Sequence, residues 1–196
     1  PDMDVTRLVS AGKKWWPWLT VAAVLVLTIG QLHHQGRVWW CSCGRPSLWE
    51  GDIWSLHNSQ HWFDPYSFTH VLHGVIFCGL VAWLLPRVLV TWRLTGVVIL
   101  ESLWEVLENS AFVIQRYREA TIGLGYEGDS IANSMADVLC CALGFVLARA
   151  LGFRWSMVLF VVTELVLLFW IRDNLTLNVL MLVCPIDAIK AWQMIH

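Results

Sequence analysis

The chain has 196 residues, of which 57% are hydrophobic and only 14% are charged, and it contains 14 tryptophans. A soluble domain of this length carries about a quarter charged residues, so the composition argues against an ordinary soluble protein. The net charge of −2 and the lack of a basic tract exclude nucleic acid as an expected partner. We therefore expect residues 1–196 to form a single integral membrane domain in contact with membrane lipids.

Six hydrophobic stretches approach the length of about 20 residues that a helix needs to cross the hydrocarbon core. They cover residues 16–34, 68–86, 93–114, 131–151, 154–171 and 175–192. The first lacks the small-residue cleavage site of a signal peptide, so we expect it to be retained. The last is short, and Pro185 is expected to kink it. The sequence thus predicts an all-α, polytopic membrane bundle with about six transmembrane helices.

The lysines and arginines near the span ends predict the orientation, because cytoplasmic loops carry an excess of these residues. With the N-terminus inside, the larger, inner set is Arg7, Lys13, Lys14, Arg87, Arg93, Arg149, Arg154 and Lys190. The smaller, outer set is Arg37, Arg45, Arg116, Arg118 and Arg172. This asymmetry predicts that both termini are cytoplasmic and that loops 35–67 and 116–130 lie outside.

Loop 35–67 is rich in tryptophan and histidine. Its aromatic side chains are expected to rest on the lipid headgroups; they are Trp39, Trp40, Trp49, Trp54 and Trp62. Cys41 and Cys43 form a C-x-C pair, which is half of a zinc site, and their role stays open. His57 and His61 have the i, i+4 spacing of two metal ligands, provided that the loop is helical there.

Three predicted spans carry polar residues on one face. In "ESLWEVLEN", residues 101–109, three glutamates follow one another at i, i+4 and i+7. Asp129, Asn133 and Asp137 are spaced i, i+4 and i+8 at the start of the next span, and His70 and His73 are i, i+3 neighbours. Because lipid cannot satisfy such groups, we expect the three faces to meet in the bundle interior.

Several carboxylates packed together need protons, cations or arginine partners. We therefore predict a divalent metal ion of unknown identity. Its candidate ligands are His70, His73, Glu101, Glu105, Glu108, Asp129 and Asp137. The alternative is a buried hydrogen-bond network that only fixes helix packing.

The same residues suggest a chemistry. Glu105, Asp129 and His73 are the candidate catalytic groups of a metal-assisted hydrolase or transferase acting on a lipid or lipid-linked substrate. The candidate substrate-binding residues, chosen because guanidinium groups pair well with phosphate, are Arg116, Arg118, Arg172 and Asn133. The alternative is a non-catalytic accessory or structural subunit of a larger membrane complex. A proton or metal transporter fits less well, because "FCGLVAWLL" and "CCALGFVLA" leave the inner halves of two spans apolar.

Long motifs carry a family resemblance. "HWFDPYSFTHVLHG", "LWEVLENSAFVIQRYREAT", "GYEGDSIANSMADVL" and "IRDNLTLNVLMLVCPIDAIKAWQ" resemble the UPF0314-type proteins of alphaproteobacteria. The resemblance implies a multi-pass protein of the bacterial inner membrane, but it implies no activity. In such a membrane the charge asymmetry predicts that loops 35–67 and 116–130 lie in the periplasm. A more distant similarity to VanZ-like membrane proteins rests on His73, Glu105, Glu108, Asp129, Asn133 and Asp137.

Overall fold

The computed structural model describes residues 5–45 and 47–195, and these residues form seven helices. In chain order the helices are α1 (Val5–His34), α2 (Ser67–Leu84), α3 (Val90–Glu108), α4 (Ala111–Ala120), α5 (Ile131–Ile171), α6 (Leu175–Val183) and α7 (Asp187–Gln193). Among the described residues, extended segments pair only at one isolated bridge, between Trp49 and Phe63. The all-α class is therefore confirmed. The side chains of Arg7, Lys13 and Lys14 lie outside the described part.

Three helices are long and apolar enough to cross a membrane, judged by length and composition. They are α1 from Trp15 onward, α2 and α5. Their outer surfaces carry large apolar side chains, such as Trp83, Phe153 and Phe169, which are 77%, 82% and 83% exposed. Apolar side chains exposed over whole helices are unfavourable in water and favourable in lipid, so the surface fits a membrane protein.

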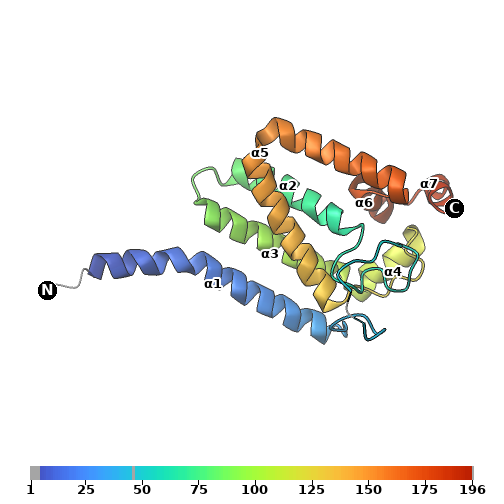
Figure 1. Ribbon diagram of the computed structural model, residues 1–196, viewed down its shortest axis with the longest axis horizontal. Coiled ribbons are helices and arrows are strands. Elements are labelled where there is room, and N and C mark those ends of the chain that lie inside the picture. The colour runs from blue at the N-terminus through green and yellow to red at the C-terminus, as the bar shows by residue number, and fades with distance from the viewer. Residues whose placement is uncertain (1–4, 46, 196) are drawn as a thin grey trace.

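Helix α5 consists of two helical halves that meet at Gly152. This glycine has φ +72° and ψ 172°, a backbone conformation that side chains disfavour, and the helix bends back there (Figure 1). The Ser156 hydroxyl donates to the carbonyls of Gly152 and Ala148, at 2.8 and 3.3 Å, and so stabilises the bend. The two halves correspond to the spans predicted over 131–151 and 154–171.

The C-terminal part differs from the predicted sixth span. The chain breaks at Cys184–Ile186, around Pro185, into the short helices α6 and α7, because proline cannot donate the amide that a continuous helix needs. Neither helix approaches the length of a membrane span. Figure 1 places the start of α1 and the end of α7 at opposite ends of the molecule. Six transmembrane helices and two cytoplasmic termini are therefore not confirmed.

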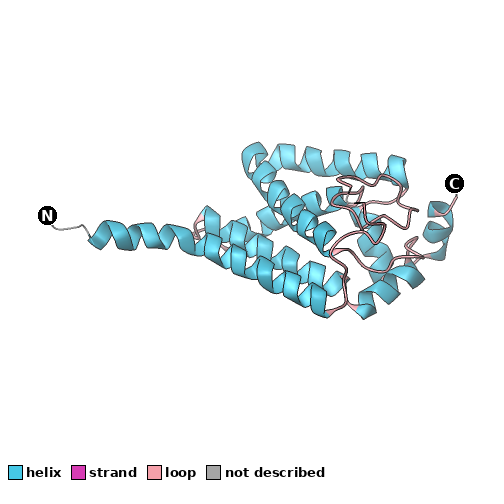
Figure 2. Cartoon of the chain, turned by 60° about the horizontal axis from the view of Figure 1, so that its bottom comes forward, coloured by secondary structure: helices cyan, strands magenta, loops and turns pink. Residues whose placement is uncertain are grey.

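The predicted third span is also interrupted. Helix α3 ends at Glu108, and Ser110 begins α4 by accepting a hydrogen bond from the amide of Val113. Helix α4 therefore occupies the first part of the predicted outer loop 116–130. Most of the loop chain gathers at the end of the molecule where α3 ends and α5 begins (Figure 2).

Helices α2 and α5 pack closely because glycines face each other at their crossing. A Cβ atom on Gly74 would lie 1.9 Å from the carbonyl oxygen of Cys141, and one on Gly144 would lie 2.0 Å from that of Val71. Small residues allow such close backbone approach and are common where membrane helices meet. On the other side of the bundle, Thr95 of α3 donates to the Pro17 carbonyl of α1 at 3.4 Å.

The long loop between α1 and α2 is fastened to the start of α5. The first amides of a helix have no partner inside the helix. Here the carbonyls of Ser59, Val38 and Trp39 accept from the amides of residues 130, 131 and 132, at 2.9, 2.8 and 3.0 Å. The Gln60 amide group also donates to the Gly128 carbonyl at 2.8 Å. The loop therefore positions the polar face of α5.

Candidate metal-binding site

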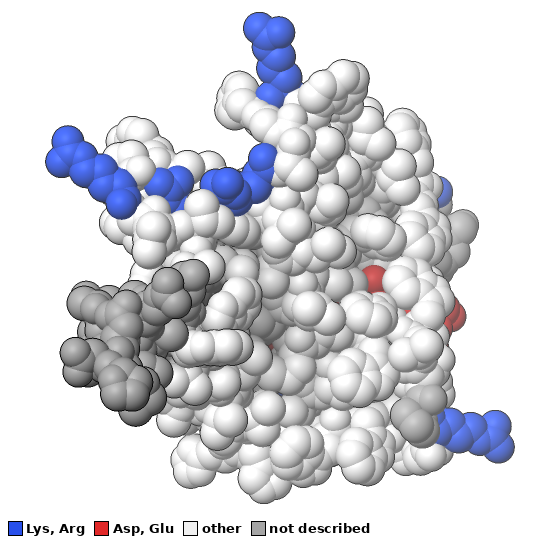
Figure 3. Space-filling model, turned by 60° about the vertical axis from the view of Figure 1, so that its left-hand side comes forward, with Lys and Arg blue, Asp and Glu red and all other residues white. Residues whose placement is uncertain are grey.

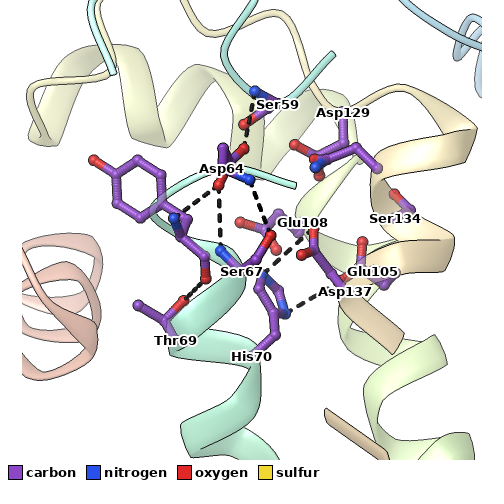
Figure 4. A network of polar contacts seen from close by, with 12 residues as sticks. Ser59, Asp64, Ser67, Thr69, His70, Glu105, Glu108, Asp129, Ser134 and Asp137 are labelled. Carbon is purple, nitrogen blue, oxygen red and sulfur yellow. Dashed lines mark hydrogen bonds and ion pairs between the residues drawn. The ribbon is translucent and has the colours of Figure 1, made fainter. Parts of the chain in front are cut away.

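Two histidines on α2 form the centre of a buried polar group that we call the interior cluster. Its members are His70, His73, Glu101, Glu105, Glu108 and Asp137. The close crossing with α5 brings His70 near Asp137, with 3.9 Å between His70 Nε2 and Asp137 Oδ2. Figure 4 shows His70 pointing between the carboxylates of α3 and that of α5. The three predicted polar faces thus meet in the structure.

Glu101 pairs with both imidazoles. His70 Nδ1 lies 2.5 Å from Glu101 Oε1, and His73 Nδ1 lies 3.0 and 3.1 Å from the two oxygens. The Glu101 side chain is fully buried and His73 is partly buried. A carboxylate that accepts from a histidine fixes the ring and leaves its second nitrogen available, an arrangement common behind metal-bound histidines. Glu101 therefore orients His70 and His73.

Glu105 lies one turn further along α3, and its carboxylate lacks the hydrogen bonds that Glu101 has. It is fully buried, and His70 Nδ1 is 3.5 Å from its Oε1. Within the described residues, neither of its carboxylate oxygens has a hydrogen-bond partner. Glu108 accepts from the Tyr117 hydroxyl at 2.7 Å, but its second oxygen and Oδ1 of Asp137 are also without a partner there. Buried carboxylate oxygens of this kind are costly unless a proton or a cation compensates them.

Asp129, just before α5, belongs to a neighbouring and fully paired network. Its two oxygens accept from the Asn109 side chain at 2.9 Å and from the Tyr126 hydroxyl at 3.0 Å, and its amide donates to Asn109 at 2.7 Å. Burial raises the pKa of Asp129, and the two hydrogen bonds oppose that rise by favouring the ionised form. Asp129 thus ties the end of α3 to the start of α5.

Asp64 was not singled out from the sequence. It is buried, and Oδ1 accepts from the amides of Tyr66 and Ser67, at 2.7 and 3.2 Å, so it holds the turn that leads into α2. Burial raises its pKa to about 6, and the nearby charge of Asp129 adds to the rise. The Asp-Pro-Tyr-Ser stretch before an apolar run is a recognisable signal for a helix start and would have identified this residue.

The predicted substrate-binding residues all contact backbone carbonyls. Arg116 donates to Leu182 at 2.8 Å and Arg118 donates to Tyr126 at 2.6 Å. Arg172 donates to the carbonyl of Trp192, and Asn133 donates to that of Trp62, both at 3.3 Å. Arg172 also borders a surface pocket beside Asp52 and Trp170, at the end of α5. The structure does not place the arginines in the interior cluster, and their substrate role stays a prediction.

Two sets within the interior cluster have the composition and spacing of metal ligands. One ligand atom from each residue lies within 4.8 Å of the others in the sets His70–His73–Glu101 and His70–Glu105–Glu108. Imidazole nitrogens and carboxylate oxygens together suit zinc and other divalent transition metals. Because Glu101 already pairs with both histidines, the second set has the greater need of a cation.

A second group of ligand atoms lies in the loop between α1 and α2. We call it the loop cluster: Cys41, Cys43, His57 and His61, with one ligand atom from each within 4.8 Å of the others. The sequence predicted two separate pairs here. Their sequence separation, with no helix between them, concealed that they meet; counting Cys and His residues within one loop would have suggested it.

Comparison with known proteins places the chain in a family. The family described as "Protein of unknown function (DUF2585)" matches residues 32–195. The chain belongs to the DUF2585 family. It is 46% identical to a UPF0314 protein of Sphingopyxis alaskensis over 90% of this chain and 94% of that one. It is 48% identical to a UPF0314 protein of Sinorhizobium fredii over 91% of each chain, and 44% identical to one of Rhizobium johnstonii over 97% of each.

The match spans α2 to α7, which include the interior cluster, and the loop that holds the loop cluster. No solved structure matches the chain. The predicted resemblance to UPF0314-type proteins is confirmed. The distant VanZ-like similarity is not shown and stays a prediction.

Proposed function

We propose that this DUF2585 protein is a multi-pass protein of the bacterial inner membrane whose interior cluster binds a divalent metal ion. In the proposal, α1, α2, α3 and the two halves of α5 cross the bilayer. The three apolar helices support it. So do the exposed Arg87, Arg149 and Arg154, which lie where α2 joins α3 and where α5 bends. Figure 3 shows a face with projecting Lys and Arg side chains and few acidic ones.

The observation that carries the metal proposal is the state of Glu105. Both of its oxygens are buried without a hydrogen-bond partner among the described residues, beside Glu108 and His70. Removing an ionised carboxylate from water without compensation costs several kcal/mol or more, and a divalent ion compensates several carboxylates at once. Glu105, Glu108 and Asp137 would supply oxygens, and His70 would supply Nε2 while Nδ1–H donates to Glu101.

We further propose that the metal serves hydrolysis or group transfer on a lipid or lipid-linked substrate. A divalent ion polarises a carbonyl or phosphoryl oxygen and activates water. Beside such an ion Glu105 and His73 would be the groups that hold and move protons, and Asp129 would keep the ends of α3 and α5 in place through Asn109. A cluster set among membrane-spanning helices favours a substrate that is itself dissolved in the membrane.

The test compares metal content and turnover in three proteins. Full-length wild type, Glu105→Gln and the exposed control Glu119→Gln, which removes the same charge, are purified in detergent without chelator. Metal is measured per chain, and hydrolysis of lipid esters and lipid-linked phosphate esters is followed in mixed micelles. We expect Glu105→Gln to lose about one ion per chain and all turnover, and Glu119→Gln to match wild type. A folded Glu105→Gln protein with the metal content of wild type refutes the proposal.

The accessory-subunit alternative is favoured by one observation. The three arginines predicted to bind an anionic substrate each donate to a backbone carbonyl instead. In that case the interior cluster would bind metal, or protons, only to hold the helices together. Wild-type protein with bound metal and no turnover of any ester, together with a lowered melting temperature in Glu105→Gln, is the result that identifies this role.

A further inference from the structure

The loop cluster is separate from the interior cluster and differs from it in chemistry. It combines two thiols with two imidazoles, whereas the interior cluster has carboxylates and imidazoles. Cys41 Sγ lies 3.2 Å from His57 Nδ1, and the rings of His57 and His61 have their centroids 5.7 Å apart. Two sulfurs and two imidazole nitrogens form one of the common donor sets of tetrahedral structural zinc. We propose that Cys41, Cys43, His57 and His61 bind one zinc ion.

The distances fit a tetrahedral ion with small adjustments. Zinc bonds of about 2.3 Å to sulfur and about 2.0 Å to nitrogen place the four donor atoms about 3.3–3.8 Å apart. The donor atoms of the loop cluster already lie within 4.8 Å of one another. Movements of about 1 Å or less, by side chains of a loop, would therefore complete the coordination shell.

The surroundings of Cys41 already suit a metal-bound sulfur. The backbone amide of Cys43 donates to Cys41 Sγ at 3.3 Å, and such outer-shell donors stabilise a ligating thiolate. His61 Nδ1 accepts from the Ser47 amide at 3.2 Å, so ligation through that atom exchanges one hydrogen bond for a metal bond.

Burial divides the four ligands in a way that suits ion entry. Cys41 and His61 are buried, whereas Cys43 and His57 are exposed. An ion can therefore reach the loop cluster from solvent, with the exposed pair closing over it. Loop 35–66 has one isolated β-bridge among its described residues and little regular structure to hold it. A structural metal commonly supplies the missing stability in segments of this kind.

The zinc ion would also hold the loop against the start of α5. Residues 38–39, just before the two cysteines, and residues 59–60, between the two histidines, make the hydrogen bonds to residues 128–132. Fixing 41–43 to 57–61 thus fixes the loop carbonyls that cap α5. The ion is structural in this proposal, because all four coordination positions are occupied by protein ligands.

The test uses cobalt as a probe. Tetrahedral Co²⁺ absorbs visible light strongly, and cobalt bound to thiolate adds a sulfur-to-metal charge-transfer band that carboxylate and imidazole ligands do not give. Full-length protein, reduced and stripped of metal by chelator, is titrated with Co²⁺ and then with Zn²⁺. We expect one equivalent of Co²⁺ to produce both features and zinc to displace it.

Two ligand variants and three control variants locate the ion. Cys43→Ser and His57→Gln replace the two exposed ligands. The controls Cys184→Ser and His34→Gln make the same changes at an exposed cysteine and an exposed histidine outside the loop cluster. Loss of an outer-shell partner alone weakens metal sites about 10- to 100-fold, so each ligand variant should bind at least tenfold more weakly. Both controls, and Glu105→Gln in the interior cluster, should keep the charge-transfer band. The band measured in Glu105→Gln separates failure of the zinc proposal from failure of the proposed function.

Two results overturn the proposal. One is reduced wild-type protein that gives no charge-transfer band with Co²⁺. The other is a band that keeps its intensity and affinity in both Cys43→Ser and His57→Gln. Since the wild-type titration needs no substitution, the first result is informative even if a variant does not fold.

Discussion

The α2–α5 crossing gives the sharpest stability prediction. In Gly74→Ala, the added Cβ would lie 1.9 Å from the Cys141 carbonyl oxygen and 2.7 Å from the Phe145 amide nitrogen. Both neighbours are backbone atoms of a helix and cannot rotate away. Ordinary contact begins near 3.4 Å, so the helices must separate by about 1.5 Å, the difference between 3.4 and 1.9 Å.

The magnitude follows from two opposing contributions. Forcing extra atoms into a close-packed contact costs about 1–3 kcal/mol, sometimes more. Replacing glycine by alanine within a helix contributes about 1 kcal/mol of stability. The control Gly79→Ala lies on the same helix with nothing within 4 Å of the new Cβ, so only the favourable contribution applies. The two variants should thus differ by about 1–3 kcal/mol in the free energy of unfolding.

Thermal unfolding of both variants in the same detergent measures this difference. We expect Gly79→Ala to melt at or above the wild-type temperature and Gly74→Ala to melt several degrees lower. Moving α2 outward also lengthens the contact between His70 and Asp137, now 3.9 Å, so Gly74→Ala should lose metal from the interior cluster. Equal melting temperatures for the two variants would refute the assigned close approach of α2 and α5.

Two further predictions concern groups outside the spans. Burial raises the pKa of Asp173 to about 6 from its ordinary 3.8, so the folded protein favours the protonated carboxyl. The stability that this carboxyl contributes to the folded state is complete below about pH 4 and is lost as the pH rises through about 6. The shift of about 2 units corresponds to about 3 kcal/mol, and Asp173→Asn should flatten the dependence of melting temperature on pH between about 4 and 7. A membrane-impermeant thiol reagent should label the exposed Cys43 faster than the buried Cys41, and added Zn²⁺ should protect both. Equal labelling rates would contradict the burial of Cys41, and labelling only from the cytoplasmic side would contradict the proposed orientation.

The interior cluster was accessible to sequence reasoning because its residues lie on regular helices. Glutamates spaced i, i+4 and i+7 must share a helical face, and lipid on one side leaves the bundle interior as their only favourable place. The structure has this arrangement around Glu105 and His70. The roles assigned to these side chains remain predictions.

The remaining differences come from features that periodicity does not encode. Asn109, at the end of α3, donates to the distant Asp129, and Ser110 begins a new helix by accepting from the Val113 amide. Pro185 divides the last apolar stretch completely rather than kinking it. The arginines were assigned to an anion from charge alone, yet the ends of α6 and α7 and the loop after α4 leave carbonyls that need donors. The loop cluster depends on how an irregular loop folds back, which a single sequence does not specify.

The two clusters are mechanically connected through α5. The carbonyls of residues 38, 39 and 59 cap α5, and Asp137 lies within its first two turns, beside His70. Asp64, in the same loop, holds the turn that leads into α2 and His70. An ion in the loop cluster would therefore restrict both helices that supply the interior ligands. If binding at one cluster raises the affinity at the other, the effect must be reciprocal and equal in free energy. A loop without regular structure thereby becomes part of how the buried site is held together.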